Sequence, residues 1–139
     1  MIYLLDTNVI SEMRKPKPHG GVSAWLHSLS PEEIRVPAVV IAELQCGAEI
    51  TRAQSPAKAM ELDRWIDQIL ATFAVLPMDG EMFRDWARLM LHTEDSLSAD
   101  AMIATTARAH RIAVATRNVK DFARFGIQVF NPFTYKENL

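Results

Sequence analysis

Short apolar runs alternate along this chain with longer stretches in which apolar residues recur at the spacing of a helix. The run at residues 2–5 lacks the apolar–polar alternation of a half-exposed strand. An unbroken apolar run of this kind is typical of a strand that is buried on both faces. A second buried strand is predicted at residues 74–78, with further strands at residues 35–37, 112–116 and 127–130. Because strands buried on both faces occur in parallel sheets covered by helices, the pattern predicts an α/β sandwich around a mostly parallel sheet.

The segments between these runs are predicted to be helices. The clearest spans residues 57–73, where apolar side chains recur at i, i+3, i+4 and i+7: Leu62, Trp65, Ile66, Ile69, Leu70 and Phe73. Other helices are predicted at residues 9–13, 22–29, 39–51, 81–92 and 98–110. The segment at residues 98–110 is rich in alanine, which lets a helix approach its neighbours closely.

Length and composition limit the class of protein. The chain has 139 residues, 49% of them hydrophobic, which suits one domain over residues 1–139 with a buried core. Its net charge of −2 excludes a globally basic nucleic-acid-binding protein. The one cysteine, Cys46, excludes an internal disulfide and a cysteine-based zinc cluster, and we expect it in the core. With no membrane-length apolar run and no signal peptide, we expect a cytoplasmic protein with no membrane partner.

Three carboxylates stand alone within apolar stretches. Asp6 follows Ile-Tyr-Leu-Leu, Glu43 lies in Val-Val-Ile-Ala-Glu-Leu, and Asp100 lies in Leu-Ser-Ala-Asp-Ala-Met-Ile-Ala. Burying a carboxylate without a partner is costly, and no basic residue stands beside any of the three. A shared hard cation explains all three, and Mg²⁺ or Mn²⁺ takes such oxygen ligands and keeps some of its waters.

Each acid also has a purely structural alternative. Asp6 is suited to capping the helix that begins near Thr7, and Glu43 to an ion pair on a helix surface. Asp100 falls in a first helical turn, where the helix dipole favours an acid.

A fourth polar group follows the predicted strand at residues 112–116. Asn118 or Asp121 is suited to supporting the metal or its water, and the Thr116 hydroxyl to hydrogen-bonding a ligating carboxylate. Sites in open α/β sheets lie beyond the carboxyl ends of the strands, which is where residues 6–8 and 116–121 fall. The alternative is an ordinary turn in which Asp121 caps the segment that follows.

Four motifs follow one another in order along the chain: Leu-Leu-Asp-Thr-Asn at residues 4–8, Ala-Glu-Leu at 42–44, Ala-Asp-Ala-Met-Ile-Ala at 99–104 and Ala-Thr-Arg-Asn at 115–118. With these motifs the chain resembles the PIN-domain nucleases, and among them the VapC and FitB type of toxin. The closing Val-Phe-Asn-Pro-Phe at 129–133 is similar to the FitB branch. The resemblance implies a PIN-like three-layer α/β/α sandwich.

The resemblance also implies an activity, a site and partners. It implies a Mg²⁺-dependent endoribonuclease, a hydrolase that is the toxin of a type II toxin–antitoxin pair, forms a homodimer and is neutralised by an antitoxin protein. Asp6, Glu43 and Asp100 would form its acidic metal site, with Asn8 as a hydrogen-bonding residue at the rim. At the position matched to the family's fourth acid this sequence has Asn118, with Asp121 three residues on, so both stay candidates and one or two metals are possible.

The charges are distributed unevenly along the chain. Residues 78–100 carry six acids and two bases, a local charge of −4, whereas residues 108–124 carry five bases and one acid, a local charge of +4. An acidic metal pocket beside a basic surface suits an RNA substrate, and Arg14, Lys15 and Arg117 are the candidate RNA contacts. The alternative for the basic residues at helix ends is stabilisation of the helix dipole.

Other functions fit the sequence less well. A phosphatase of the haloacid-dehalogenase type needs a second aspartate two residues after Asp6, where this chain has Asn8. A response-regulator receiver needs an acidic pair at the end of the first strand, where only one acid stands. A non-catalytic PIN-like module that binds nucleic acid or an antitoxin is the remaining alternative.

Overall fold

Five short strands form one sheet in which every neighbouring pair is parallel. In the computed structural model, which describes residues 1–137, the order is β3-β2-β1-β4-β5. Residues 138–139 of the predicted domain lie outside the described part. The strands are β1 (Tyr3–Leu5), β2 (Ile34–Pro37), β3 (Ala74–Leu76), β4 (Ala113–Ala115) and β5 (Val129–Phe130). The predicted α/β class is confirmed, and the sheet is parallel throughout.

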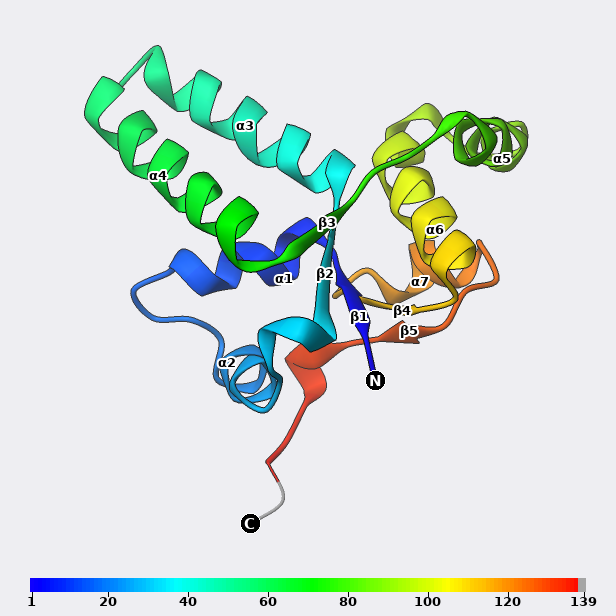
Figure 1. The fold of residues 1–139 in the computed structure, drawn as a ribbon, viewed down its shortest axis with the longest axis horizontal. Coiled ribbons are helices and arrows are strands. Elements are labelled where there is room, and N and C mark those ends of the chain that lie inside the picture. The colour runs from blue at the N-terminus through cyan, green and yellow to red at the C-terminus, as the bar shows by residue number, and fades with distance from the viewer. Residues whose placement is uncertain (138–139) are drawn as a thin grey trace.

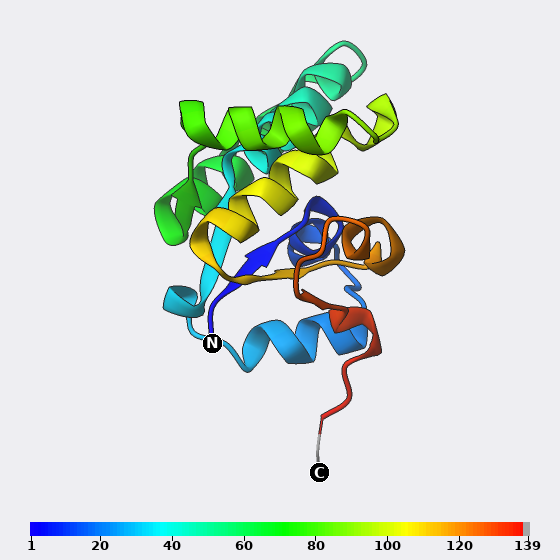
Figure 2. The same ribbon diagram turned by 90° about the vertical axis from the view of Figure 1, so that its right-hand side faces the viewer.

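Helices cover both faces of this sheet. They are α1 (Thr7–Ile10), α2 (Gly20–His27), α3 (Ala38–Arg52), α4 (Pro56–Thr72), α5 (Gly80–Met90), α6 (Ser98–His110) and α7 (Val119–Ala123). Short 3₁₀ turns are η1 (Ser11–Arg14), η2 (Pro31–Glu33), η3 (Asp95–Leu97) and η4 (Pro132–Thr134). Figure 1 shows the elements around the sheet, and Figure 2 shows β1 and β4 between α6 on one side and α2 on the other. This is the three-layer α/β/α arrangement that the resemblance to PIN-domain nucleases implies.

The core forms where apolar strands meet small helical side chains. The inner strands β1 and β4 bury Leu4, Leu5 and the whole of Ala113–Ala115. Helix α6 faces them with buried alanines at positions 101, 104 and 107, which allow its backbone to approach the sheet closely. Within the described residues, none of the helices combines the length and the apolar character that crossing a membrane requires.

Four local predictions differ from the structure. Strand β3 is at the edge of the sheet with Ala74 exposed, so it is not buried on both faces. Cys46 is exposed on α3, and Leu70 on α4 is 49% exposed, because these helices extend beyond the sheet and have one face toward solvent. The stretch after residue 118 forms the short helix α7, in contrast to the ordinary turn that was the structural alternative for this segment.

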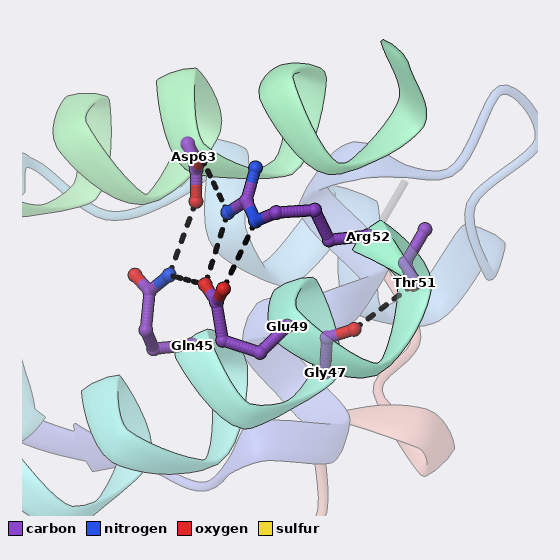
Figure 3. A network of polar contacts seen from close by, with 6 residues as sticks. All are labelled: Gln45, Gly47, Glu49, Thr51, Arg52 and Asp63. Carbon is purple, nitrogen blue, oxygen red and sulfur yellow. Dashed lines mark hydrogen bonds and ion pairs between the residues drawn. The ribbon is translucent and has the colours of Figure 1, made fainter. Parts of the chain in front are cut away.

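Helices α3 and α4 lie side by side, and an ion-pair network joins them. Arg52 Nη2 donates to Asp63 Oδ2 at 2.7 Å, and Arg52 Nε donates to Glu49 Oε1 at 2.9 Å. Gln45 Nε2 donates to Glu49 Oε2 at 2.7 Å and to Asp63 Oδ1 at 3.1 Å (Figure 3). Hydrogen bonds from Arg52 and Gln45 lower the pKa of Glu49 to about 2. The network is partly exposed, so its contribution to stability is modest.

The substitution Arg52→Ala is expected to lower the Tm near neutral pH by roughly 2–5 °C, because Glu49 and Asp63 lose their shared cation. A lowered pKa means that this contribution is fully present above the ordinary value of 4.5 and is lost as the pH falls toward about 2. Melting scans across this range should therefore converge for the two proteins. Arg64→Ala on the exposed part of α4 is the control, and a difference that stays constant down to about pH 2 would contradict the account.

Candidate active site

Four acidic side chains come from four elements that meet at one edge of the sheet. Asp6 directly follows β1, and Asp121 lies in α7, shortly after β4. Glu43 lies in α3, which begins where β2 ends, and Asp100 lies in the first turn of α6. In a parallel sheet all carboxyl ends point the same way, so this topology places the four acids at the carboxyl edge, where sites in such folds form.

The carboxylate of Asp6 is buried and held by three hydrogen bonds. Asp6 is only 4% exposed, and its Oδ1 accepts from the backbone N–H of Thr7 at 2.7 Å. Its Oδ2 accepts from the Thr116 hydroxyl at 2.7 Å and from Asn8 Nδ2 at 3.2 Å. Burial raises the pKa of Asp6, and the three hydrogen bonds oppose that rise. The side chain caps α1, as the structural alternative predicts, yet one helix cap does not account for the bonds from Thr116 and Asn8.

Thr116 ties the loop after β4 to the loop after β1. Its fully buried hydroxyl donates to Asp6 and accepts from the backbone N–H of Asn118 at 2.9 Å. Asn8 completes the link, because its Oδ1 accepts from the backbone N–H of Arg117 at 3.2 Å. Thr116 and Asn8, both predicted to support the site, therefore orient Asp6. They also fix the segment that carries Arg117 and Asn118.

Glu43 lies at the exposed rim of the site. Its Oε1 accepts from the Thr7 hydroxyl at 2.9 Å. Thr7 therefore contacts both acids, because its backbone N–H donates to Asp6 and its side chain donates to Glu43. Partial desolvation raises the pKa of Glu43, and the negative charge of Asp6 adds to the rise. The structure gives Glu43 no basic partner among the described residues, in contrast to the structural alternative.

Asp100 carries the largest shift among the acids of the cluster. Desolvation raises its pKa to about 6, and the negative charges of Asp6, Asp121 and Glu43 all act in the same direction. The helix that carries it is anchored by α5, because Trp86 Nε1 donates to the carbonyl of Ser98 at 3.0 Å. Desolvation is the larger cause of this rise in pKa, and the like charges of the other three acids add to it.

Asp121 and Asn118, the two candidates for the fourth acidic position, differ in their surroundings. The charge of Asp121 acts on Asp100, whereas Asn118 is exposed and uses its backbone N–H to bond Thr116. Both residues lie at the start of α7, one helical turn apart. The acidic cluster is defined here as Asp6, Glu43, Asp100 and Asp121.

The acidic cluster suits a hard divalent cation. Within residues 1–137, no Lys, Arg or His forms an ion pair with any of its four members, so their mutual repulsion is not compensated by the protein. In the described part of the chain, no three His, Cys, Asp or Glu side chains converge closely enough to hold an ion together. A hard divalent cation is often bound by only one or two carboxylates together with several waters, so a site for one does not require three converging side chains.

The three predicted RNA contacts lie in different surroundings. Lys15 is ion-paired with Glu12, whose side chain is only 5% exposed. The Arg14 guanidinium lies 5.9 Å from the centre of the Trp65 ring, beside a hollow of about 620 Å³ that none of the acidic cluster lines. Arg117 alone is bonded through its backbone to the residues around Asp6.

Two residues at the site were missed by sequence reasoning. Thr7 was considered only as a cap, although it donates to both Asp6 and Glu43. Glu12 was overlooked because Ser-Glu-Met-Arg-Lys reads as a surface segment. Its position three residues after the buried Val9 places it on the same face of a helix, and this spacing could have revealed its burial.

Comparisons with known proteins agree with this geometry. The PIN domain family matches residues 3–128. Toxin FitB of Neisseria gonorrhoeae is 37% identical over 136 residues, which cover 94% of this chain and 97% of that protein. VapC ribonuclease Y4jK of Sinorhizobium fredii is 35% identical, with 94% of this chain and 96% of that protein covered. The crystal structure of FitAcB from Neisseria gonorrhoeae superposes with a TM-score of 0.84 at 36% identity, covering 96% of this chain and 99% of that one.

The substitution Asp100→Asn is expected to stabilise the metal-free protein. Because the folded-state pKa of Asp100, about 6, exceeds its ordinary value of 3.8, ionisation opposes folding, with the full cost present above about pH 6. Allowing for solvent screening, the gain is about 1 kcal/mol at neutral pH, measured by denaturant unfolding in EDTA. The gain should disappear below about pH 4, and Asp67→Asn on exposed α4 is the control. A variant that is less stable than the wild type at neutral pH would contradict this.

Proposed function

This chain belongs to the PIN-domain family, and on that premise we propose that it is a metal-dependent endoribonuclease that hydrolyses RNA phosphodiesters. The observation that carries the proposal is the acidic cluster, which gathers at the carboxyl edge of the sheet without a compensating cation. Two relatives that match this chain over most of their length are named ribonucleases, and this supports RNA as the substrate. We also propose that it acts in the cytoplasm, where cellular RNA is available.

We propose Mg²⁺ as the metal, with Mn²⁺ able to replace it. Asp6 and Asp100 would hold the ion, and Glu43 and Asp121 would complete its surroundings, in part through water. When bound, such an ion would neutralise phosphate charge, lower the pKa of a bound water and stabilise the negative charge that develops during hydrolysis.

The protein's own groups have separate tasks in this reaction. Thr116, Asn8 and the Thr7 N–H hold the Asp6 carboxylate in one orientation, so its oxygens are in place before RNA arrives. The Thr7 hydroxyl orients Glu43, whose exposed carboxylate accepts a proton from the attacking water. The raised pKa of Glu43 brings its basicity closer to the working pH, which favours this role.

We also propose that the protein acts as the toxin of a type II toxin–antitoxin pair and pairs with itself as a homodimer. Solved relatives include complexes of FitAB and VapBC type, which support a cognate antitoxin as a partner. The α3–α4 pair has exposed apolar side chains suited to such contacts: Ile50 at 72%, Met60 at 51% and Leu70 at 49% exposure.

Cleavage of RNA should depend on a divalent cation and on the buried acid. The wild type is expected to cut total RNA with Mg²⁺ or Mn²⁺ and to lose this activity in EDTA. Asp6→Asn keeps the shape of the side chain but removes its charge, so kcat/KM should fall by about 100-fold or more. Asp67→Asn, an exposed acid on α4, should retain full activity.

The alternative of a non-catalytic PIN-like module predicts the opposite outcome. In that case the wild type cuts no RNA with any metal, or Asp6→Asn cuts as well as the wild type after equal purification. Mapping of the cut ends separates true activity from a contaminating nuclease, since a contaminant leaves the same ends in both preparations.

The fourth acid can be identified by comparing two substitutions. Asp121→Asn should lower kcat/KM by about 10-fold or more, because Asp121 is the group whose charge acts on Asp100. Asn118→Ala should lower it by less than about 3-fold, since its backbone makes the contact with Thr116. A larger loss in Asn118→Ala than in Asp121→Asn would assign the role to Asn118.

A further inference from the structure

The guanidinium of Arg117 lies on the ring of Phe133, at the C-terminal end of the described chain. Its central carbon is 3.9 Å from the ring centroid, a closer contact than the 5.9 Å between Arg14 and Trp65. The Arg117 backbone N–H donates to Asn8, and Asn8 Nδ2 donates to the buried Asp6. The backbone of Arg117 is therefore linked to the acidic cluster through a single side chain, that of Asn8.

Phe133 is itself fixed by the elements around it. Its backbone N–H donates to Asn131 Oδ1 at 3.0 Å, and its ring centroid lies 5.0 Å from that of His19. The turn η4 approaches α2 so closely that a Cβ on Gly21 would lie 2.9 Å from the carbonyl oxygen of Tyr135. The ring beneath Arg117 is thus in place without a bound substrate.

The charge of Arg117 is directed to the flank of the site. Hydrogen bonds from Lys15 and His19 lower the pKa of Glu12, and the charge of Arg117 adds to this effect. Within the described residues, no cation contributes to the pKa shifts of Asp6 or Asp100. Glu12 already has partners, because it pairs with Lys15 and accepts from the backbone N–H of His19 at 2.8 Å. A guanidinium stacked on a ring keeps the N–H groups of its edge available for two parallel bonds to a phosphate.

We propose that Phe133 is a positioning residue that holds Arg117 for an RNA phosphate neighbouring the one that is cleaved. This inference rests on the proposed function and adds the C-terminal turn η4 to the substrate-binding surface. Such a contact contributes to binding of RNA rather than to the chemical step, because within the described residues the guanidinium lies on the Phe133 ring and forms no ion pair with Asp6 or Asp100.

The test uses kinetics on a single-stranded RNA of mixed sequence with a fluorophore and a quencher. Phe133→Leu is expected to raise KM by about 3- to 10-fold and to leave kcat within about 2-fold. The dependence of log KM on log salt should become shallower by about 0.7, the value for one lost phosphate contact on a single strand. Phe133→Tyr, which keeps the ring, should restore the wild-type values.

Two further variants separate positioning from a general structural effect. If Phe133 acts through Arg117, the double variant Arg117→Ala/Phe133→Leu should be no worse than Arg117→Ala alone. Arg117→Lys keeps the charge but loses the planar stack, so it should resemble Phe133→Leu even if the leucine variant folds poorly. Arg64→Ala on exposed α4 is the charge control and should leave KM unchanged.

The possible failures are distinguishable. Additive effects of Arg117→Ala and Phe133→Leu, or a loss in kcat with KM and the salt dependence unchanged, would overturn the positioning role while the nuclease stands. If the wild type neither cuts nor binds the RNA, the proposed function itself fails, and this inference fails with it.

Discussion

The buried carboxylate of Asp6 is the group on which the rest of the site depends. It sits where β1 ends, and the Thr116 hydroxyl that follows β4 closes onto it at 2.7 Å. Because β1 and β4 are neighbours in the sheet, this contact joins two segments that are 110 residues apart in sequence. The same hydroxyl and Asn8 then fix the backbone of Arg117 and Asn118, so both the acidic cluster and its basic flank are built outward from one carboxylate.

Accumulated negative charge is the second constraint. The parallel topology brings four acids to one edge, and desolvation together with repulsion raises the pKa of Asp100 to about 6. Natural proteins keep such unfavourable arrangements chiefly where function requires them, and a divalent cation would relieve this one. The alanines of α6 contribute indirectly, because close approach of this helix to the sheet brings Asp100 near the other acids.

Much of this arrangement could be predicted from the sequence. Lone acids in apolar stretches drew attention to Asp6, Glu43 and Asp100, and a strand was predicted in each of the five places where one forms. The edge position of β3 and the exposure of Cys46 were missed, because periodicity shows that a side chain is apolar and not what covers it. Glu12 was missed because its segment reads as a solvated surface, although its main partners, Lys15 and His19, are close in sequence. The contact of Phe133 was missed because its partner, Arg117, is distant in sequence.

Direct measurement of Mn²⁺ binding by the RNA-free protein tests the central claim that the acidic cluster holds a divalent cation. Electron paramagnetic resonance counts free Mn²⁺ during a titration and needs neither substrate nor turnover. The account predicts saturable binding by the wild type that is lost in the Asp6→Asn and Asp100→Asn variants and retained in Asp67→Asn. Equal binding by all four proteins, or none by the wild type, would contradict it.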